Sequence, residues 1–200
     1  MGRPVKEKSL TRQDVINAAI SCLDKEGEAA LGVNRVAREL GIKPPAIYKH
    51  LDGNAALKRA VALTIWQQYI QWCHKQTEGL ESPHALLQAG GQATRNFAKT
   101  HPERYRTMTQ FQLNLNDVET APLIQEVFIF LKRVLQPYNL SETRLIDAMR
   151  TVNAAITGFI ALEQAGLMTL ERSADTSYQI MLDALVVAIQ YIQQQVEPQS

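Results

Sequence analysis

The stretch from Val33 to Leu51 constrains the fold of this chain more than any other part of the sequence. Val36, Ala37 and Leu40 have the spacing of residues that share one face of a short helix. Gly41 follows directly, at the position where a left-handed residue ends a helix at the lowest cost. The spacing therefore predicts a short helix that stops at a tight turn.

A second short helix can begin at Pro44 or Pro45, because a proline in the first helical turn loses no intrahelical hydrogen bond. Ile47 and Leu51 then face the first helix, and Tyr48 and Lys49 face outward with polar tips suited to DNA. These features together predict a helix-turn-helix. A generic corner between two helices is the alternative, but it has no reason to combine a small residue at the crossing, a glycine in the turn and apolar residues on both sides.

The run from Thr11 to about Leu57, including A-x-x-L-G-I-K-P-P-A-I-Y-K-H-L, resembles the N-terminal DNA-binding domain of the TetR (tetracycline repressor) family of transcriptional regulators. This resemblance covers about the first quarter of the chain. It implies a regulator whose second domain dimerises and senses a small molecule.

The charge of the chain is unevenly distributed. Residues 1–60 hold eleven Lys or Arg against seven Asp or Glu, which leaves a net charge of −3 for residues 61–200 out of the total of +1. A basic segment that coincides with a helix-turn-helix is the electrostatic footprint expected of a DNA-binding protein. A solvated surface would explain the same modest charge.

Helical signals continue to the C-terminus, and no β pattern appears. Thr11 and Asp14 form a capping box for a first helix that ends near Gly27, and the turn at Asp52–Asn54 caps a long helix from about Ala55 to Thr77. Further helices are expected after Ser82, from Pro102, after Thr120, from Ser141 to Gly166 and from Ala174 to Gln195.

The expected fold class is all-α, with about nine helices. Residues 1–54, with a flexible arm at 1–10, form a three-helix DNA-binding domain. The long helix joins it to a larger helical domain, residues 55–200, that binds the effector and dimerises. Within that domain the apolar run Val127–Leu131 is expected to be buried, and Gly90–Gly91 is expected to be a weak point of its helix.

In a helix-turn-helix the second helix enters the major groove and the first crosses the backbone. This geometry and the resemblance to the TetR family together imply a set of DNA-contacting residues: Arg3, Asn34, Arg35, Lys43, Pro45, Tyr48, Lys49, His50 and Asn54. Three alternatives stay open: a disordered arm around Arg3, a Tyr48 that only closes the small core, and a His50 that is an ordinary surface residue. The family usually has a Lys-acid pair where this chain has Asn54 and Ala55, so a phosphate contact there is lost or replaced.

Aromatic and sulfur-bearing residues in the second domain suggest an apolar effector pocket with a few polar groups. Its predicted members are Tyr69, Trp72, Phe97, Tyr105, Met108, Phe111, Phe128, Asn153 and Thr157. A solid helical core is the alternative. No catalytic or metal-binding motif is present, so we expect no enzyme activity, no metal and no cofactor.

The last two long helices carry wide apolar faces and are expected to form a homodimer as a four-helix bundle. The predicted interface residues are Phe159, Ile160, Leu182, Leu185 and Ile189. The expected function is a dimeric, ligand-responsive repressor of a palindromic operator, with double-stranded DNA and a small molecule as partners. The alternative is a helical protein-interaction module whose helix-turn-helix no longer binds DNA.

Neither a signal peptide nor a run of 18 apolar residues is visible, and Cys22 and Cys73 are too few for a disulfide framework. A cytoplasmic protein without membrane contact is therefore expected.

Overall fold

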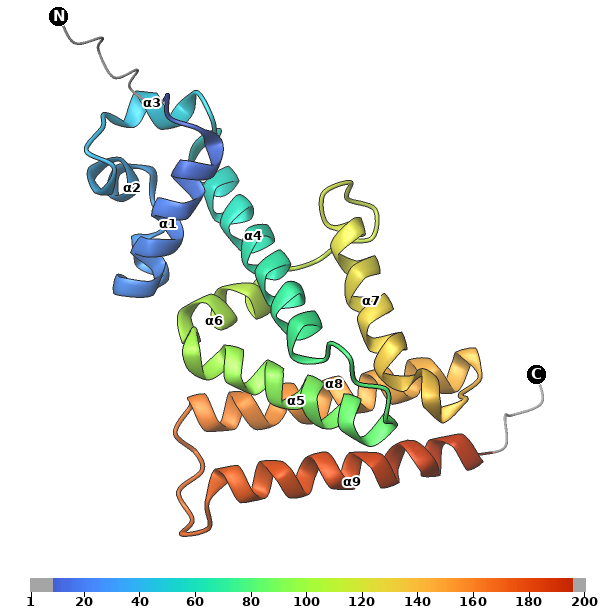
Figure 1. The fold of residues 1–200 in the computed structure, drawn as a ribbon. Coiled ribbons are helices and arrows are strands. Elements are labelled where there is room, and N and C mark those ends of the chain that lie inside the picture. Colours follow the sequence, from blue (N-terminus) through green and yellow to red (C-terminus); the bar gives the residue numbers. More distant parts are fainter. Residues whose placement is uncertain (1–8, 196–200) are drawn as a thin grey trace, which may run out of the picture. The chain divides into compact units, whose positions relative to one another are not determined.

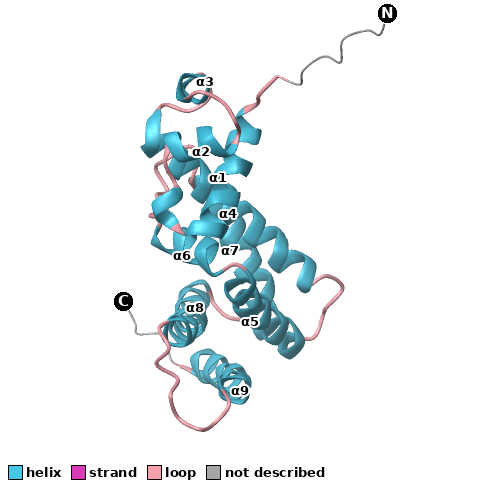
Figure 2. Cartoon of the chain, turned by 90° about the vertical axis from the view of Figure 1, so that its left-hand side faces the viewer, coloured by secondary structure: helices cyan, strands magenta, loops and turns pink. Residues whose placement is uncertain are grey.

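The structure is a computed structural model that describes residues 9–195. Over these residues all regular secondary structure is helical, and no β-strand occurs (Figures 1 and 2). The described α-helices are α1 (Arg12–Glu26), α2 (Val33–Glu39), α3 (Pro44–Tyr48), α4 (Gly53–Gln76), α5 (Pro83–Thr100), α6 (Pro102–Gln110), α7 (Ala121–Leu135), α8 (Glu142–Gln164) and α9 (Ala174–Gln194). Two short 3₁₀ turns, η1 (Glu28–Ala30) and η2 (Gln136–Tyr138), complete the list. The all-α prediction is confirmed.

Helix α1 begins with the predicted capping box. The Thr11 hydroxyl accepts a hydrogen bond from the Asp14 N–H at 3.1 Å, and the Asp14 carboxylate accepts one from the Thr11 N–H at 2.9 Å. Both N-terminal donors are therefore satisfied by side chains. The helix ends at Gly27, whose φ of 77° lies in the region that favours glycine.

The predicted helix-turn-helix is α2, a turn and α3. Gly41 adopts a φ of 66°, and the Ile42 N–H donates to the Ala37 carbonyl at 2.9 Å, which closes the end of α2. Ala37 and Ile47 are buried where the two helices meet. The sequence pattern and the structure agree here because the turn and the small core are both local.

Helix α4 starts two residues earlier than expected, at Gly53, and its 24 residues span about 36 Å. The sequence suggested that Asn54 caps this helix, but Asn54 lies inside its first turn. Its side chain acts on α2 instead, because Asn54 Oδ1 accepts a hydrogen bond from the Val33 N–H at 2.9 Å. Gly32, the residue before α2, offers no side chain for this purpose.

The chain divides into two compact units. The first contains Met1–Trp66 and Glu103–Gln112, and the second contains Gln67–Pro102 and Leu113–Ser200. The division runs through α4, whereas the sequence suggested a boundary after residue 54. It also groups nearly all of α6 with the helix-turn-helix, where the guanidinium of Arg104 forms two hydrogen bonds to the Asp24 carboxylate at 2.8 and 2.6 Å.

In the second unit, α8 and α9 lie side by side and α5 packs on both, as the two cartoon views agree (Figures 1 and 2). Helix α7 packs on α5 and α8. Among the described residues, α8 is the one helix long and apolar enough to cross a membrane by length and composition. The same composition suits a helix that packs on three neighbours.

Gly91 sets how closely α5 approaches α9. A Cβ atom at this position would lie 2.5 Å from Leu182 Cδ2, and Leu182 is fully buried. Beside it, the Tyr178 hydroxyl donates to the Gly91 carbonyl at 2.7 Å. Helix α5 is continuous through Gly90–Gly91, and Gly91 allows the close packing on α9. That the two glycines weaken the helix stays a prediction for stability measurements.

The prediction that Val127–Leu131 is buried is wrong in part. Phe130 is 9 % exposed, but Phe128 is 44 % and Ile129 is 60 % exposed. Helix α7 buries a single stripe, with Leu123, Phe130 and Val134 along it, because it packs on the rest of the unit from one side only.

Candidate DNA-binding surface and effector region

Helix α3 presents a polar outer side. Lys43, Pro45 and Lys49 are exposed, and Tyr48 is 55 % exposed, so Tyr48 does not close the core of the unit. His50 is half-buried, while Ile47 on the opposite side of α3 is fully buried. The outer side of α3 is thus free to approach base edges and phosphates.

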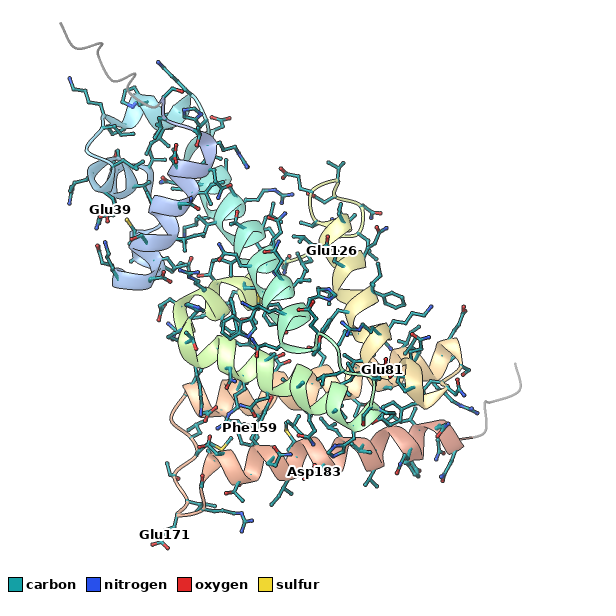
Figure 3. The ribbon with its side chains drawn as sticks, in the orientation of Figure 1. Glu39, Glu81, Glu126, Phe159, Glu171 and Asp183 are labelled. Carbon is teal, nitrogen blue, oxygen red and sulfur yellow. The ribbon has the colours of Figure 1, made fainter. Side chains whose placement is uncertain are left out.

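Asn34 and Arg35 in the first turn of α2 differ from each other. Asn34 is exposed, whereas Arg35 is half-buried, and its guanidinium binds the carboxylates of Glu26 and Glu39, the latter at 2.9 Å (Glu39 is labelled in Figure 3). Lys25 also binds Glu39, at 2.8 Å. Hydrogen bonds from Arg35 hold the pKa of Glu26 below its usual value, and those from Lys25 and then Arg35 do so for Glu39.

This network has a consequence for DNA contact. Both carboxylates raise the pKa of Arg35, so its charge is permanent but already engaged within the unit. A phosphate would have to compete with two carboxylates for the same guanidinium. The structure therefore places Arg35 in a role that holds α1 and α2 together, in addition to the backbone contact predicted for it.

Asn54 likewise has an internal task as the cap of α2, and the cations that follow it are engaged too. Lys58 Nζ lies 2.9 Å from the Glu28 carboxylate, and the Arg59 guanidinium lies 5.8 Å from the centre of the Phe111 ring. Arg3 lies outside the described residues. The sequence did not single out Arg38, which is exposed in the last turn of α2 and makes no ion pair within the described part of the chain. The sequence did offer a sign of this exposure, because Arg38 lies two positions from Val36 and therefore on the opposite side of α2 from the core.

The predicted effector residues are divided between the units. Tyr69, Trp72 and Phe97 come together in the second unit, where Phe97 lies edge-on to the other two rings at 5.3 and 6.1 Å. The Tyr69 hydroxyl is hydrogen-bonded to that of Thr94 at 3.0 Å, and Trp72 Nε1 donates to the Ala93 carbonyl at 3.0 Å. These three residues form an aromatic cluster whose polar atoms are satisfied.

Phe128, Asn153 and Thr157 also belong to the second unit, Phe128 on α7 and the other two on α8. Phe128 and Asn153 are exposed, and the Thr157 hydroxyl donates to the Asn153 carbonyl of its own helix. The hydrogen-bonding capacity of the Thr157 hydroxyl as a donor is used within its own helix, so it does not indicate a ligand site.

Tyr105, Met108 and Phe111 belong to the first unit. Tyr105 and Met108 are buried, and the Met108 carbonyl accepts a hydrogen bond from Trp66 Nε1 at 3.1 Å. Phe111 lines a cavity of about 140 Å³ with Glu28, Leu31, Lys58, Ala62, Thr107 and Gln110. This volume is below that of a typical pocket for a drug-sized molecule.

The residues predicted for the dimer interface are on the wrong side of their helices. Ile160, Leu182, Leu185 and Ile189 are buried within the protomer. Phe159 is half-buried against the Tyr178 ring at 4.9 Å, and Figure 3 shows it on α8 beside α9. The large apolar side chains that remain exposed on these helices are Ile146 and Leu162 on α8 and Ile180, Val187 and Tyr191 on α9. The inner faces are used because α5, α8 and α9 need them to pack on one another.

No group of three or more His, Cys, Asp or Glu side chains suited to a metal ion occurs among the described residues. Both cysteines are buried, and burial raises the pKa of the Cys22 thiol and raises that of Cys73 to about 11. Thiols of this kind are poor nucleophiles at neutral pH.

Comparisons with known proteins cover both parts of the chain. Residues 87–185 match the family described as Tetracyclin repressor-like, C-terminal domain. An uncharacterised HTH-type transcriptional regulator of Mycobacterium tuberculosis is 31 % identical over 168 residues, which cover 84 % of this chain and 75 % of that protein. The class D tetracycline repressor of Escherichia coli is 38 % identical over 56 residues, or 28 % of this chain and 26 % of the repressor.

Solved structures show the same fold. A TetR variant from Acinetobacter baumannii in complex with minocycline aligns with a TM-score of 0.69 at 20 % identity, over 93 % of this chain and 99 % of that chain. A protein of unknown function from Rhodococcus aligns with a TM-score of 0.76 at 18 % identity, over 96 % of this chain and all of that chain.

Proposed function

Since this chain belongs to the TetR family of transcriptional regulators, we propose that it is a repressor that binds a palindromic operator as a homodimer and leaves it when a small, largely apolar effector binds. The family and the fold are those of DNA-binding transcription regulators and not of enzymes. A cytoplasmic location, with access to the chromosome, is part of the proposal.

The exposed outer side of α3 carries the proposal of operator binding. Lys43 and Lys49 make no ion pair within the described residues, and Tyr48 stands exposed on the same short helix. Two lysines without carboxylate partners can release counterions from phosphates, and the tyrosine can contact base edges. Asn34, Pro45, His50 and Arg38 border this surface.

The exposed apolar stripe of α9 supports the homodimer. Ile180, Val187 and Tyr191 are spaced by seven and four residues, so they form one stripe along α9. An apolar stripe along a long helix is the kind of surface that two copies bury in a four-helix bundle. A twofold dimer would present two recognition helices to half-sites about 34 Å apart.

The aromatic cluster of Tyr69, Trp72 and Phe97 is where we propose that the effector acts. The solved relative from Acinetobacter baumannii holds minocycline, which makes a small-molecule ligand plausible for this fold. Binding would favour a dimer whose recognition helices no longer match the operator. The solid core remains the alternative and is the expected result if no effector is found.

Selection of bound sequences from a random duplex pool tests the operator proposal. We expect an inverted repeat, bound with an affinity that falls linearly with the logarithm of salt concentration. Joint replacement of Tyr48→Ala and Lys49→Gln should lower operator affinity by about 3 kcal/mol, while the circular dichroism spectrum and the melting temperature stay unchanged.

Arg172→Gln is the matched control, because Arg172 is an exposed cation in the loop between α8 and α9. It should bind the operator as the unaltered chain does. Operator binding that survives the Tyr48–Lys49 replacement would rule out α3 as the reading helix. Absence of any duplex retention would favour the protein-interaction module.

The effector proposal is tested by fluorescence. In a Trp66→Phe variant the remaining indole is that of Trp72, so quenching by members of a panel of apolar compounds reports on the aromatic cluster. Compounds that quench Trp72 should also release the operator. Quenching without any change in operator affinity would contradict the proposed mechanism.

A further inference from the structure

A separate surface pocket of about 330 Å³ lies at the C-terminal end of α4, within the second unit. Its lining residues are His74, Lys75, Glu78, Gly79 and Arg133. The aromatic cluster contributes none of them. The pocket is thus chemically different from the proposed effector region, because three of its five residues carry or can carry a positive charge.

Arg133 is the central observation. It is half-buried, and its Nη2 donates a hydrogen bond to the Thr77 carbonyl at 2.8 Å, but no carboxylate lies within ion-pair distance of it among the described residues. Arg95, the buried arginine of the same unit, binds both Glu163 and Asp175. A partly desolvated guanidinium without an anion is suited to take one, because an anion compensates the cost of desolvating the charge.

The end of α4 does not repel an anion as a bare helix C-terminus would. The Thr77 hydroxyl donates to the carbonyls of Cys73 and His74 at 2.9 and 3.2 Å, and Arg133 satisfies the Thr77 carbonyl. The carbonyls of Cys73, His74 and Thr77 therefore have donors, and Lys75 in the last turn opposes the negative end of the dipole. The His74 ring is held edge-on to Phe130 at 5.2 Å.

We propose that this pocket binds a small organic oxyanion, a carboxylate or a phosphate ester. The remaining guanidinium donors of Arg133 suit two oxygens of one oxyanion, and Lys75 and His74 offer further donors from the facing helix. Glu78 in the wall selects a ligand that also carries a hydroxyl or amino donor. The volume exceeds that of a simple inorganic ion and reaches the lower range of small-molecule sites.

Isothermal titration calorimetry of the full chain without DNA tests the proposal, with malate and inorganic phosphate as probes and sodium chloride as ionic-strength control. We expect saturable binding of at least one probe. Lys75→Gln and Arg133→Gln should each weaken it at least about tenfold. Lys132→Gln is the matched control and should leave it unchanged, because Lys132 is an exposed cation on the same helix that lines a different cavity.

The variants also separate binding from folding. Arg133→Gln removes the donor to the Thr77 carbonyl and lowers the melting temperature. Lys75 is exposed and makes no hydrogen bond or ion pair among the described residues, so Lys75→Gln perturbs the fold much less. Saturation by malate only or by phosphate only identifies the carboxylate or the phosphate as the ligand group. Absence of saturation up to about 10 mM, or equal weakening by Lys132→Gln, would overturn the site. Neither outcome bears on operator binding.

Discussion

Asn54 illustrates how one side chain holds two helices. Its Oδ1 satisfies the Val33 N–H at the start of α2, although 21 positions separate the two residues. Gly32 leaves α2 without a cap of its own, so the first turn depends on this remote oxygen. Asn54 lacks the charge that the family usually has at this position, but in this chain its side chain caps α2.

Replacing Asn54→Ala should lower the free energy of unfolding by about 1 kcal/mol, the typical cost of losing a helix cap. Urea denaturation followed by circular dichroism measures the change. Asn34→Ala, an exposed asparagine on the same α2 helix, should change it by less than about 0.5 kcal/mol. Equal effects of the two variants would show that Asn54 does not act as a cap.

Gly90 and Gly91 provide a second matched pair. A methyl group at Gly91 would meet buried Leu182 at 2.5 Å, whereas one at Gly90 would meet Phe130 at an ordinary 3.7 Å. We expect Gly91→Ala to destabilise the chain by about 1–2 kcal/mol through overpacking. Gly90→Ala should stabilise it by up to about 1 kcal/mol through helix propensity. Thermal unfolding of both variants measures these effects. Stabilisation by Gly91→Ala would mean that α5 and α9 move apart enough to accommodate the methyl group.

At the scale of elements, a buried ion network joins α5, α8 and α9. Arg95 is 2 % exposed, binds the Glu163 carboxylate from α8 and lies 2.8 Å from that of Asp175 on α9. Its guanidinium also lies over the Tyr178 ring, 4.6 Å from the centre. Hydrogen bonds hold the pKa of both carboxyls below their usual values, from Arg95 for Glu163 and from Lys99 and then Arg95 for Asp175.

This network makes a prediction about acid stability. A carboxyl whose folded pKa is lowered stabilises the fold above its unfolded value, and that contribution is lost as the pH falls through the folded pKa. For Glu163 the loss should therefore occur below pH 4.5, its ordinary value. Urea midpoints measured from neutral pH into this range should show the unaltered chain losing stability.

Glu163→Gln should remove part of that pH dependence, since Glu26, Glu39 and Asp175 also have lowered pKa values, and should cost about 3 kcal/mol at neutral pH, because it leaves a buried arginine without its main partner. Asp175→Asn should cost less, since its side chain is 75 % exposed. If the Glu163→Gln variant loses stability at acid pH as the unaltered chain does, other carboxyls cause the pH dependence.

At the scale of the whole molecule, the protomer leaves a stripe of apolar surface on α9, a helix whose opposite side is part of the core. Val187 and Tyr191 are 64 % and 65 % exposed, directly opposite the fully buried Leu182 and Ile189. Such a helix is apolar on two sides, which accounts for the high apolar content of α9. The proposed dimer buries the outer side.

Val187→Glu should raise the dissociation constant of the homodimer at least about hundredfold, close to 3 kcal/mol, because twofold symmetry places the charge in the interface twice. Sedimentation velocity across a concentration series measures it. Ile129→Glu on α7, equally exposed, is the control and should leave the dimer intact. If only the Ile129→Glu variant dissociates, the dimer interface lies on α7 and not on α9.

The extent to which these features could be predicted differs with their range along the chain. The helix-turn-helix, the Thr11 capping box and the exposed Tyr48 and Lys49 were predictable, because each depends on neighbours within a few positions. The exposure of Phe128 and the cap function of Asn54 were not, since both depend on which distant element lies alongside. The same holds for Arg133, whose carbonyl partner is 56 positions away.

The sequence by itself therefore determined the helices, the reading motif and, through its resemblance, the family. Helical periodicity and capping are local properties of a chain, so they can be read from spacing alone. Only the tertiary structure decided which apolar face of α8 and α9 is core, which cations are already paired, and where an unpaired arginine lies in a pocket. A residue's spacing specifies the side of the helix on which it lies, but the packing of distant helices determines what covers that side.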